Sequence, residues 1–136
     1  MGRSIKVVAA IMIEDGRLFA TQRGYGAWKD WWEFPGGKVE AGETPEEALA
    51  REIKEELDTV ISVDEYLMTV EYDYPEFHIS MDCFICSIIS GELTLLEHES
   101  AKWLPVSDPW QVRWLPSDIE VIKKLSERDQ SGTHQQ

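Results

Sequence analysis

The sequence has few basic residues for its number of acidic ones. Its 136 residues include 13 Lys and Arg against 26 Asp and Glu, which gives a formal net charge of -13 at pH 7. Such a charge repels long polyanions, so we expect no nucleic-acid polymer as a partner. A small phosphorylated ligand remains compatible with it, provided that divalent cations lie between the carboxylates of the protein and the phosphates.

Cysteine and long apolar runs are also scarce. Cys83 and Cys86 are the only two cysteines, and an offset of three residues places them on opposite faces of a strand. We therefore expect ordinary reduced thiols rather than a metal or redox site. The apolar run from Val7 to Ile13 is too short to span a membrane, and no cleavage site follows it. These absences predict a cytoplasmic protein without a membrane partner.

The remaining composition is sufficient for one compact domain. Apolar residues make up 43% of the chain and include six Trp, which can build a single core. The last residues are polar and show no helical or strand period. We predict one domain over residues 1–128 and a disordered tail over 129–136.

Alternating and continuous apolar runs predict the strands. The Asp15-Gly16 pair is typical of a tight hairpin turn, and the stretch 24–32 shows no period, which predicts an irregular loop. The expected strands are a fully buried one at 5–13, its hairpin partner at 18–23, and a long antiparallel pair at 60–74 and 77–89.

One helix is predicted from clear start and stop signals. Thr44 supplies a cap, Pro45 stands at the first helical position, and Glu47 lies three residues after the cap. The helix should end at Asp58, where the apolar period stops. Its core face repeats every four residues, at Leu49, Ile53 and Leu57.

A second helix is predicted near the end of the chain. Ser117 and Glu120 have the spacing of a capping box, and an apolar stripe continues to about Ser126. Runs of strands with two helices indicate the α+β class.

Three acidic residues on the first helix suggest a metal site. Glu52, Glu55 and Glu56 stand at i, i+3 and i+4, so they share one side of the helix. A hard divalent cation with oxygen ligands would offset the repulsion between their charges. The alternative is a solvated helix face whose charges Arg51 and Lys54 balance.

The residues before the helix favour the metal site. Gly36 and Gly37 stand where backbone can approach an anion or offer a carbonyl oxygen to a metal. From Gly37 the chain runs five residues to Glu43 and then seven to Arg51-Glu52-Ile53-Lys54-Glu55-Glu56. This stretch resembles the Nudix box, a glycine, five residues, a glutamate, seven residues and then R-E-U-x-E-E-x-G-U, where U is bulky and aliphatic.

Seven of the nine specified positions of the box match. Asp58 replaces the final glycine, and Thr59 replaces the final aliphatic residue. The glycine position closes the helix, and Asp tolerates positive φ better than most residues, so we expect the turn to form at a cost of about 1 kcal/mol. The resemblance covers residues 5–126 and is strongest to MutT-type and CTP-directed members of the Nudix family.

The resemblance implies both a fold and an activity. The fold would be a Nudix α/β/α sandwich, with a mixed curved sheet between the box helix and a C-terminal helix. The activity would be Mg²⁺-dependent hydrolysis of a nucleoside triphosphate to the monophosphate and pyrophosphate, with Mn²⁺ as a substitute metal. The implied substrate is a (d)CTP-type nucleotide or an oxidised dNTP such as 8-oxo-dGTP.

The resemblance also implies roles for individual residues. The metal would be held by the carbonyl of Gly36 and by Glu52, Glu55 and Glu56, the three acids on which catalysis depends. Glu97 would approach the metal from a loop as a candidate base, with Glu99 as its substitute.

The remaining roles concern support and substrate binding. Gly37, Glu43 and Arg51 would be structural members of the box. Arg23 and Lys38 are the candidates for phosphate contact, while an exposed charge at the end of a strand is the alternative for Arg23.

The base pocket would lie across the sheet. Asp118 would read the base there, and Tyr74 and His78 would line the pocket. An ionised Asp only accepts hydrogen bonds, which favours an amino group such as that of cytosine. Capping of the helix is the other explanation for Asp118.

Other functions fit the same pattern. A Nudix hydrolase of another nucleoside diphosphate derivative and a Nudix-fold binding module without catalysis are the alternatives. The partner in each case is a small nucleotide. The protein itself would be a monomer or a homodimer.

Overall fold

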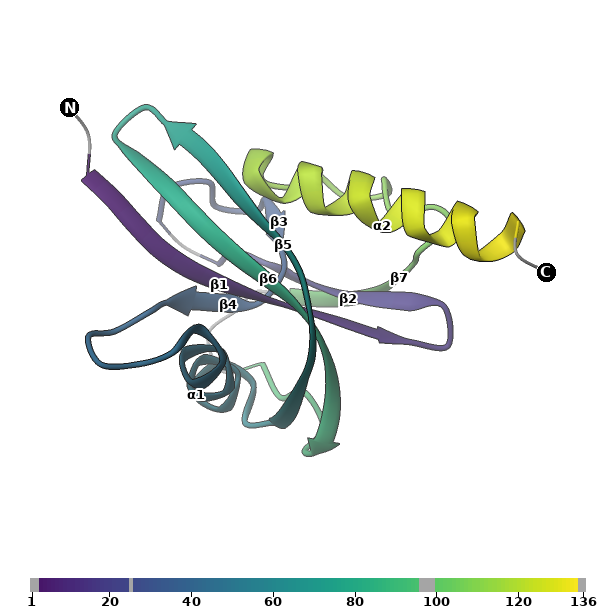
Figure 1. Ribbon diagram of the computed structural model, residues 1–136, viewed down its shortest axis with the longest axis horizontal. Coiled ribbons are helices and arrows are strands. Elements are labelled where there is room, and N and C mark those ends of the chain that lie inside the picture. The colour runs from purple at the N-terminus through teal and green to yellow at the C-terminus, as the bar shows by residue number, and fades with distance from the viewer. Residues whose placement is uncertain (1–2, 25, 96–99, 135–136) are drawn as a thin grey trace.

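A computed structural model of the chain describes residues 3–24, 26–95 and 100–134. These residues form a mixed sheet with one helix on each face, as Figure 1 shows. The predicted α/β/α arrangement is therefore confirmed. Glu97 and Glu99, the loop acids proposed near the metal, lie outside the described residues.

The described residues form seven strands and two helices. In order they are β1 (Arg3–Glu14), β2 (Arg17–Gln22), β3 (Trp32–Glu33), β4 (Gly36–Lys38), α1 (Pro45–Leu57), β5 (Val60–Tyr74), β6 (Phe77–Ser90), β7 (Ser100–Pro105) and α2 (Pro116–His134).

Strand β1 is the centre of the sheet. It runs parallel to β6, whereas the other paired strands are antiparallel, so the sheet is mixed as predicted. Its first half pairs with β4, where Val8 lies opposite Gly37 and Ala9 opposite Gly36. Its second half pairs with β2 through a hairpin. This split places the glycine pair beside the middle of the sheet.

The backbone conformation at one turn and at one helix end confirms what the residue types predicted. Asp15 and Gly16 have φ of 53° and 74°, the left-handed pair that the β1–β2 hairpin requires. Asp58 closes α1 with φ of 49°, and its backbone N–H donates to the carbonyl of Lys54. Asp therefore takes the conformation that the box assigns to glycine, as expected.

The start of α1 also forms as predicted. The hydroxyl of Thr44 accepts from the backbone N–H of Glu47, and the carboxylate of Glu47 accepts in return from the backbone N–H of Thr44. The three residues of the predicted core face are fully buried, namely Leu49, Ile53 and Leu57.

The apolar residues form a core on each face of the sheet. Alternate residues of β1 serve the two cores: Ala9 and Ile11 face α2, whereas Val8 and Ala10 face α1. Cys83 belongs to the first core and Cys86 to the second, and both are free thiols. Burial raises the pKa of Cys86 to about 12. The predicted placement of these two thiols on opposite faces is confirmed.

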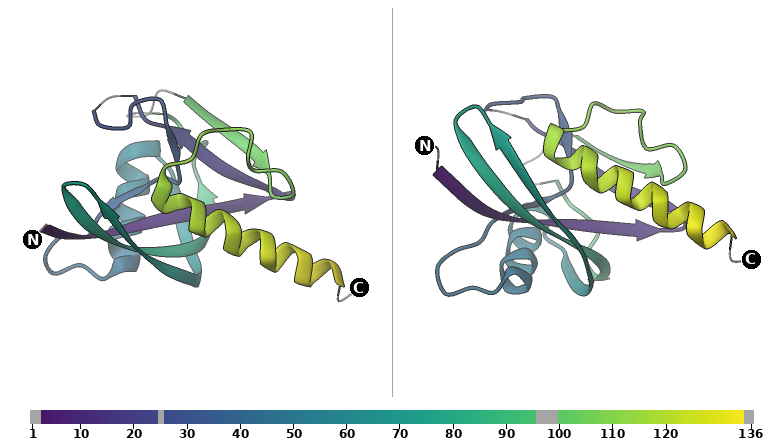
Figure 2. Two further views of the ribbon diagram at one scale, coloured as in Figure 1. Left: turned by 90° about the horizontal axis from the view of Figure 1, so that it is seen from above. Right: turned by 45° about the horizontal axis from the view of Figure 1, so that its top comes forward.

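Helix α2 differs from its prediction at both ends. It begins at Pro116, and the hydroxyl of Ser117 is hydrogen-bonded to that of Tyr74 at 2.9 Å, so Ser117 is not the expected cap. It continues to His134, past the end near Ser126 that its apolar stripe predicted, while the disordered tail over 129–136 stays a prediction. The chain beyond Ser126 is polar but has no proline, and polar residues can extend a helix into solvent. Figure 2 shows the first part of α2 lying along its face of the sheet and its C-terminal end projecting beyond the strands.

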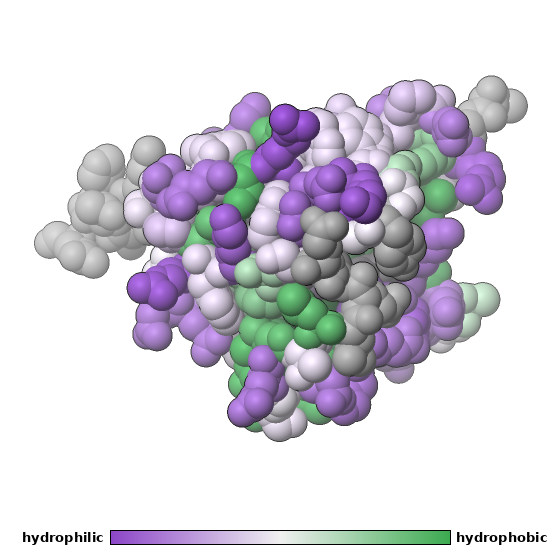
Figure 3. Space-filling model, turned by 180° about the vertical axis from the view of Figure 1, so that it is seen from behind, coloured by the Kyte–Doolittle hydropathy of each residue, from purple (hydrophilic) through white to green (hydrophobic). Residues whose placement is uncertain are grey.

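Strands β3, β4 and β7 were not predicted. The first two are only two and three residues long, and β7 was left without an assignment because its alternation is short. Neither helix in the described ranges is long and apolar enough to cross a membrane. Hydrophilic residues cover most of the face shown in Figure 3, with one apolar area in its lower half.

Candidate active site

Arg51 ties the acidic residues of the box together. Its guanidinium donates to both carboxylate oxygens of Glu43, at 2.7 and 3.0 Å. One terminal nitrogen also donates to Glu52 at 2.9 Å and to Glu55 at 3.2 Å, and the other donates to the carbonyl of Lys38 at 3.1 Å. The hydrogen bonds from Arg51 lower the pKa of Glu43. Arg51 thus pairs with Glu43, as the sequence predicted for a structural member.

The two glycines before α1 lie against different parts of the molecule. A Cβ atom on Gly37 would lie 2.3 Å from a carboxylate oxygen of Glu52, so the backbone and this acid are in close contact. A Cβ atom on Gly36 would lie 1.9 Å from the carbonyl oxygen of Val8 in β1. A Cβ atom at position 36 would collide with the backbone of β1, whereas one at position 37 would have to displace the side chain of Glu52. The two glycines thus hold a backbone bend directly against the acidic face of α1.

The donors around this bend suit a hard divalent cation. Glu52, Glu55 and Glu56 offer carboxylate oxygens, and Gly36 offers a backbone carbonyl oxygen from the adjacent strand. Within the described residues, no three potential ligands are gathered closely enough to hold a metal ion as they stand. The contacts of Arg51 explain this, because they turn Glu52 and Glu55 toward one guanidinium. Rotation of these carboxylates about their side-chain bonds is needed for a shared ion.

A cleft of about 510 Å³ opens beside the bend. This volume is within the range of small-molecule sites. Glu56 comes to the cleft from α1, Lys38 from β4 and Asp118 from α2, so the box and the other side of the sheet share one cavity. Its apolar lining comes mainly from alternate residues of β1 and β6, at Ile5, Val7, Ala9, Phe77, Ile79 and Met81.

A partly buried ion pair lies in this cleft. Arg23 donates through Nε and one terminal nitrogen to the two oxygens of Glu33, at 3.1 and 3.2 Å. Burial raises the pKa of Glu33, while the charge of Arg23 and its hydrogen bonds act in the opposite direction. Arg23, proposed from the sequence for phosphate contact, therefore lines the cleft with its guanidinium engaged by a carboxylate.

Asp118 is the most deeply buried acid among the described residues that line the cleft. Its side chain is only 3% exposed, and one carboxyl oxygen accepts from the backbone N–H of Phe34 at 3.3 Å. Burial raises the pKa of Asp118 well above its usual range, and the nearby carboxylate of Glu33 adds to the effect. Its carboxyl can therefore keep a proton where an exposed Asp has none, and then donates as well as accepts.

We expect Asp118→Asn to stabilise the protein at pH 7 and to leave its stability near pH 4 almost unchanged. Because the folded pKa is raised, the stability that the protonated carboxyl contributes is complete below the unfolded pKa of about 3.9 and is lost as pH rises toward the folded pKa. Asn has no titrating proton and can still accept from Phe34. The expected gain at pH 7 is at least about 1 kcal/mol, the value of one pKa unit. Urea unfolding of both proteins at the two pH values measures it, and equal differences at both would contradict the assignment.

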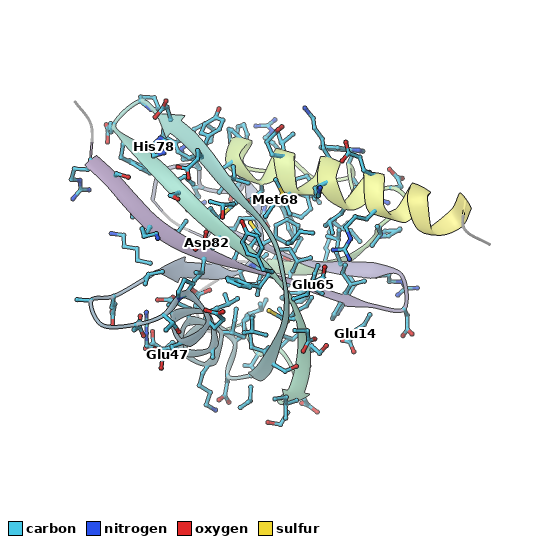
Figure 4. The ribbon with its side chains drawn as sticks, viewed as in Figure 1. Glu14, Glu47, Glu65, Met68, His78 and Asp82 are labelled. Carbon is cyan, nitrogen blue, oxygen red and sulfur yellow. The ribbon has the colours of Figure 1, made fainter. Side chains whose placement is uncertain are left out.

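Tyr74 and His78 have different positions. Tyr74 lines the cleft, as expected, and its ring packs on Phe77 with centroids 5.4 Å apart. His78 is on the opposite face of β6, because strand residues alternate and Phe77 and Ile79 face the cleft. Its ring nitrogens contact Glu71 at 2.6 Å and Asp73 at 2.7 Å, near the tip of the β5–β6 hairpin (Figure 4). His78 is therefore not brought together with the described residues that line the cleft.

Two residues of the cleft were missed by the sequence analysis. Glu33 was passed over because it stands in a two-residue strand with no visible alternation, although it directly precedes the Phe34-Pro35-Gly36-Gly37 segment. Trp28 lies in the aperiodic loop, where no pattern indicates which side chains point inward. Glu33, as an acid between two large aromatic residues, was the stronger available signal.

Comparison with known protein families matches residues 3–125 to the NUDIX domain. The chain belongs to the Nudix family. It is 32% identical over 122 residues to the CTP pyrophosphohydrolase of Escherichia coli K12, covering 89% of this chain and 90% of that protein. It is also 32% identical over 119 residues to the 8-oxo-dGTP diphosphatase of the same organism, covering 87% and 92%.

The fold agrees with the Nudix assignment. The solution structure of the E. coli ORF135 protein superposes with a TM-score of 0.82 at 30% identity, covering 94% of this chain and 92% of that one. The prediction of a Nudix hydrolase, made from the spacing of the box, is confirmed. Nudix hydrolases generally use a divalent metal, which agrees with the oxygen donors beside the glycine bend.

Proposed function

We propose that this Nudix hydrolase cleaves a nucleoside triphosphate to the nucleoside monophosphate and pyrophosphate. The observation that supports the proposal is a cleft that is lined both by Glu56 of the acidic box helix and by the buried carboxyl of Asp118. A nucleotide has the same two ends, a polyphosphate that needs cations and a base that needs directed hydrogen bonds.

The phosphate end of the site is the bend and the start of α1. Glu52, Glu55 and Glu56, with the carbonyl of Gly36, would hold Mg²⁺, which when bound neutralises phosphate charge and activates a water molecule. Arg51 supports these ligands in two ways. Its positive charge balances their negative charges, and its hydrogen bonds join α1 to Glu43, which precedes the helix. In the reaction a water oxygen adds to phosphorus, and the phosphoanhydride bond to the leaving phosphate oxygen breaks.

Lys38 supplies positive charge at the same end. It lies in β4 directly after the two glycines and lines the cleft, while its backbone carbonyl accepts from Arg51. A lysine ammonium can follow a phosphate oxygen on its flexible chain. Lys38 therefore remains the residue that we propose for contact with a phosphate, as in the sequence analysis.

The base end of the site contains Asp118 and Glu33. One oxygen of Asp118 accepts from Phe34, which leaves the other free to meet a ligand. A carboxyl that keeps its proton accepts from one group of a base and donates to its neighbour, as the amino group and ring nitrogen of cytosine require. A (d)CTP-type nucleotide is our first candidate, and the likeness to the CTP pyrophosphohydrolase supports it.

An oxidised purine is the second candidate, and it also has a specific observation in its favour. The raised pKa of Asp118 gives the site a donor, so the strict preference for an amino group that an ionised Asp would impose is relaxed. The likeness to the 8-oxo-dGTP diphosphatase points in the same direction.

A panel of normal and oxidised (d)NTPs, compared by kcat/KM with Mg²⁺, tests the proposed function. We expect pyrophosphate release and a preference of about 5- to 150-fold for one base, because a base read by paired hydrogen bonds gains about 1–3 kcal/mol. Asp118→Asn should shift that preference, since Asn cannot change its protonation. Absence of turnover for every triphosphate would contradict the reaction, and equal rates for all bases in both proteins would contradict the role of Asp118.

A further inference from the structure

The loop before β3 carries a tryptophan in a costly backbone conformation. Trp28 has φ of 65°, and Asp30 in the same loop has φ of 74°. A left-handed backbone is rare for a bulky residue and persists only where the surroundings impose it. The side chain of Trp28 lines the same cleft as Asp118 and Glu33. The strained residue is therefore the one that forms part of the wall of the site.

Arg23 is hydrogen-bonded to this loop through both its side chain and its backbone. Its guanidinium donates to the carbonyl of Ala27 at 3.0 Å, next to Trp28. Its backbone N–H donates to the carbonyl of Trp31 at 3.0 Å, and its own carbonyl accepts from Asp30 at 2.9 Å. The same guanidinium holds both oxygens of Glu33. One side chain thus connects the loop with Glu33, the partly buried acid of the cleft.

Aromatic neighbours fix the ring of Trp28. It packs edge to face with Trp31 at 4.6 Å between ring centroids and with Tyr74 at 5.6 Å. Trp31 is in turn covered by the guanidinium of Arg113, 5.1 Å from its ring. An ordered aromatic ring beside buried hydrogen-bonding carboxyls is the combination by which proteins bind an unpaired nucleobase.

Resting on the proposed function, we propose that Trp28 stacks on the nucleobase and that Arg23 is a positioning residue for this base site. Arg23 fastens the loop that carries Trp28 and orients Glu33 beside it. It does not contact the phosphates. Three of its five N–H groups are already committed to Ala27 and Glu33, and a phosphate contact that drew it away would leave the carboxylate of Glu33 buried without its partner.

Trp28→Ala tests the stacking contact. We expect KM and the inhibition constant of the monophosphate product to rise about 5- to 150-fold, the range of one base stacked on an aromatic ring, with a smaller change in kcat. The inhibition constant of pyrophosphate, which has no base, should stay at the wild-type value. Trp110→Ala is the matched control, because Trp110 is 51% exposed and is absent from the lining of the cleft.

Arg23→Gln tests the positioning role. It should raise the inhibition constant of the monophosphate and leave that of pyrophosphate unchanged. In a Trp28→Ala background its effect should shrink, because Arg23 acts partly through Trp28. Arg23→Gln with Glu33→Gln removes the unpaired carboxylate, so the same comparison can be made if the single variant fails to fold.

Each outcome decides the proposal. If Arg23→Gln weakens pyrophosphate as much as the monophosphate, Arg23 is a phosphate ligand. If the two substitutions are additive, Arg23 does not act through Trp28. Either result overturns the positioning role. If Trp28→Ala behaves like Trp110→Ala in a protein that hydrolyses triphosphates, the proposed function stands and the stacking role is wrong. A wild-type protein that hydrolyses no triphosphate overturns both the proposed function and the stacking role that rests on it.

Discussion

Glu56→Gln should lower kcat by a factor on the order of 10²–10⁴, the range for a single carboxylate that handles a proton or supports the reacting centre. Glu56 is the acid of the box helix that lines the cleft, together with Gly36 and Gly37. Gln has nearly the same shape but carries no charge, so it is a poor ligand for a hard cation and cannot accept a proton. Initial rates of pyrophosphate release with Mg²⁺ measure the loss.

The thermal midpoint separates this effect from a loss of fold. Glu56→Gln should melt within a few degrees of the wild type. Glu46→Gln is the matched control, because Glu46 is exposed in the first turn of the same helix. It should keep wild-type turnover. Full activity in Glu56→Gln, or an equal loss in Glu46→Gln, would rule out the assigned role of Glu56.

Gly36→Ala should be the most destabilising small substitution near the site. Its Cβ atom would lie 1.9 Å from the carbonyl oxygen of Val8 and 2.9 Å from the carbonyl carbon, and both are backbone atoms of the central strand. The β1–β4 pairing must therefore shift. Overpacking of this kind costs about 1–3 kcal/mol, which corresponds to a fall of roughly 5–15 °C in Tm. Calorimetry or thermal unfolding followed by circular dichroism measures it.

Gly37 and Gly42 provide the contrast for this prediction. A Cβ atom on Gly37 meets the flexible carboxylate of Glu52, so Gly37→Ala should keep most of the stability and lose activity through the displaced acid. A Cβ atom on Gly42 meets nothing within 4 Å, so the cost of Gly42→Ala comes from its φ of 86° and is about 1 kcal/mol. If all three variants melt together, the close packing of β4 on β1 is not what requires glycine at position 36.

The sequence predicted best the elements whose residues interact locally. The capping box of Thr44 and Glu47, the Asp15-Gly16 turn and the left-handed Asp58 all depend on neighbours within a few residues. The apolar periods that predicted α1, β5 and β6 are also read from residues close together in the sequence. They arise because each of these elements buries one face against another part of the molecule. These elements formed as predicted, with small differences at their ends.

The failures share a dependence on distant partners. The resemblance placed His78 in the pocket, whereas alternation along β6 turns it to the other face, where it contacts Glu71 and Asp73. Ser117 has the spacing of a cap, but Tyr74, far away in sequence, engages its hydroxyl. Helix α2 continues past its apolar stripe, where Arg128 pairs with Glu65 of β5 at 3.2 Å.

The residues of the site also divide into those predicted from nearby sequence and those that only the fold brings together. The spacing of the box located the acids, the glycines and the Glu43–Arg51 pair, because they lie on one helix and the bend before it. The base end could not be assembled from sequence, since it joins Arg23, Glu33 and Asp118 from three separate segments. The contact between these segments also changes the pKa of Asp118, which is raised by burial and by the nearby carboxylate of Glu33.

The most direct test of the account is a crystal structure with Mn²⁺ and a non-hydrolysable nucleoside triphosphate analogue, read by anomalous scattering. The account predicts metal peaks bonded to carboxylate oxygens of Glu52, Glu55 and Glu56 beside the carbonyl of Gly36, with the polyphosphate on the metal and the base next to Asp118. A nucleotide bound elsewhere, or bound in the cleft with metal that none of these glutamates touches, would contradict it.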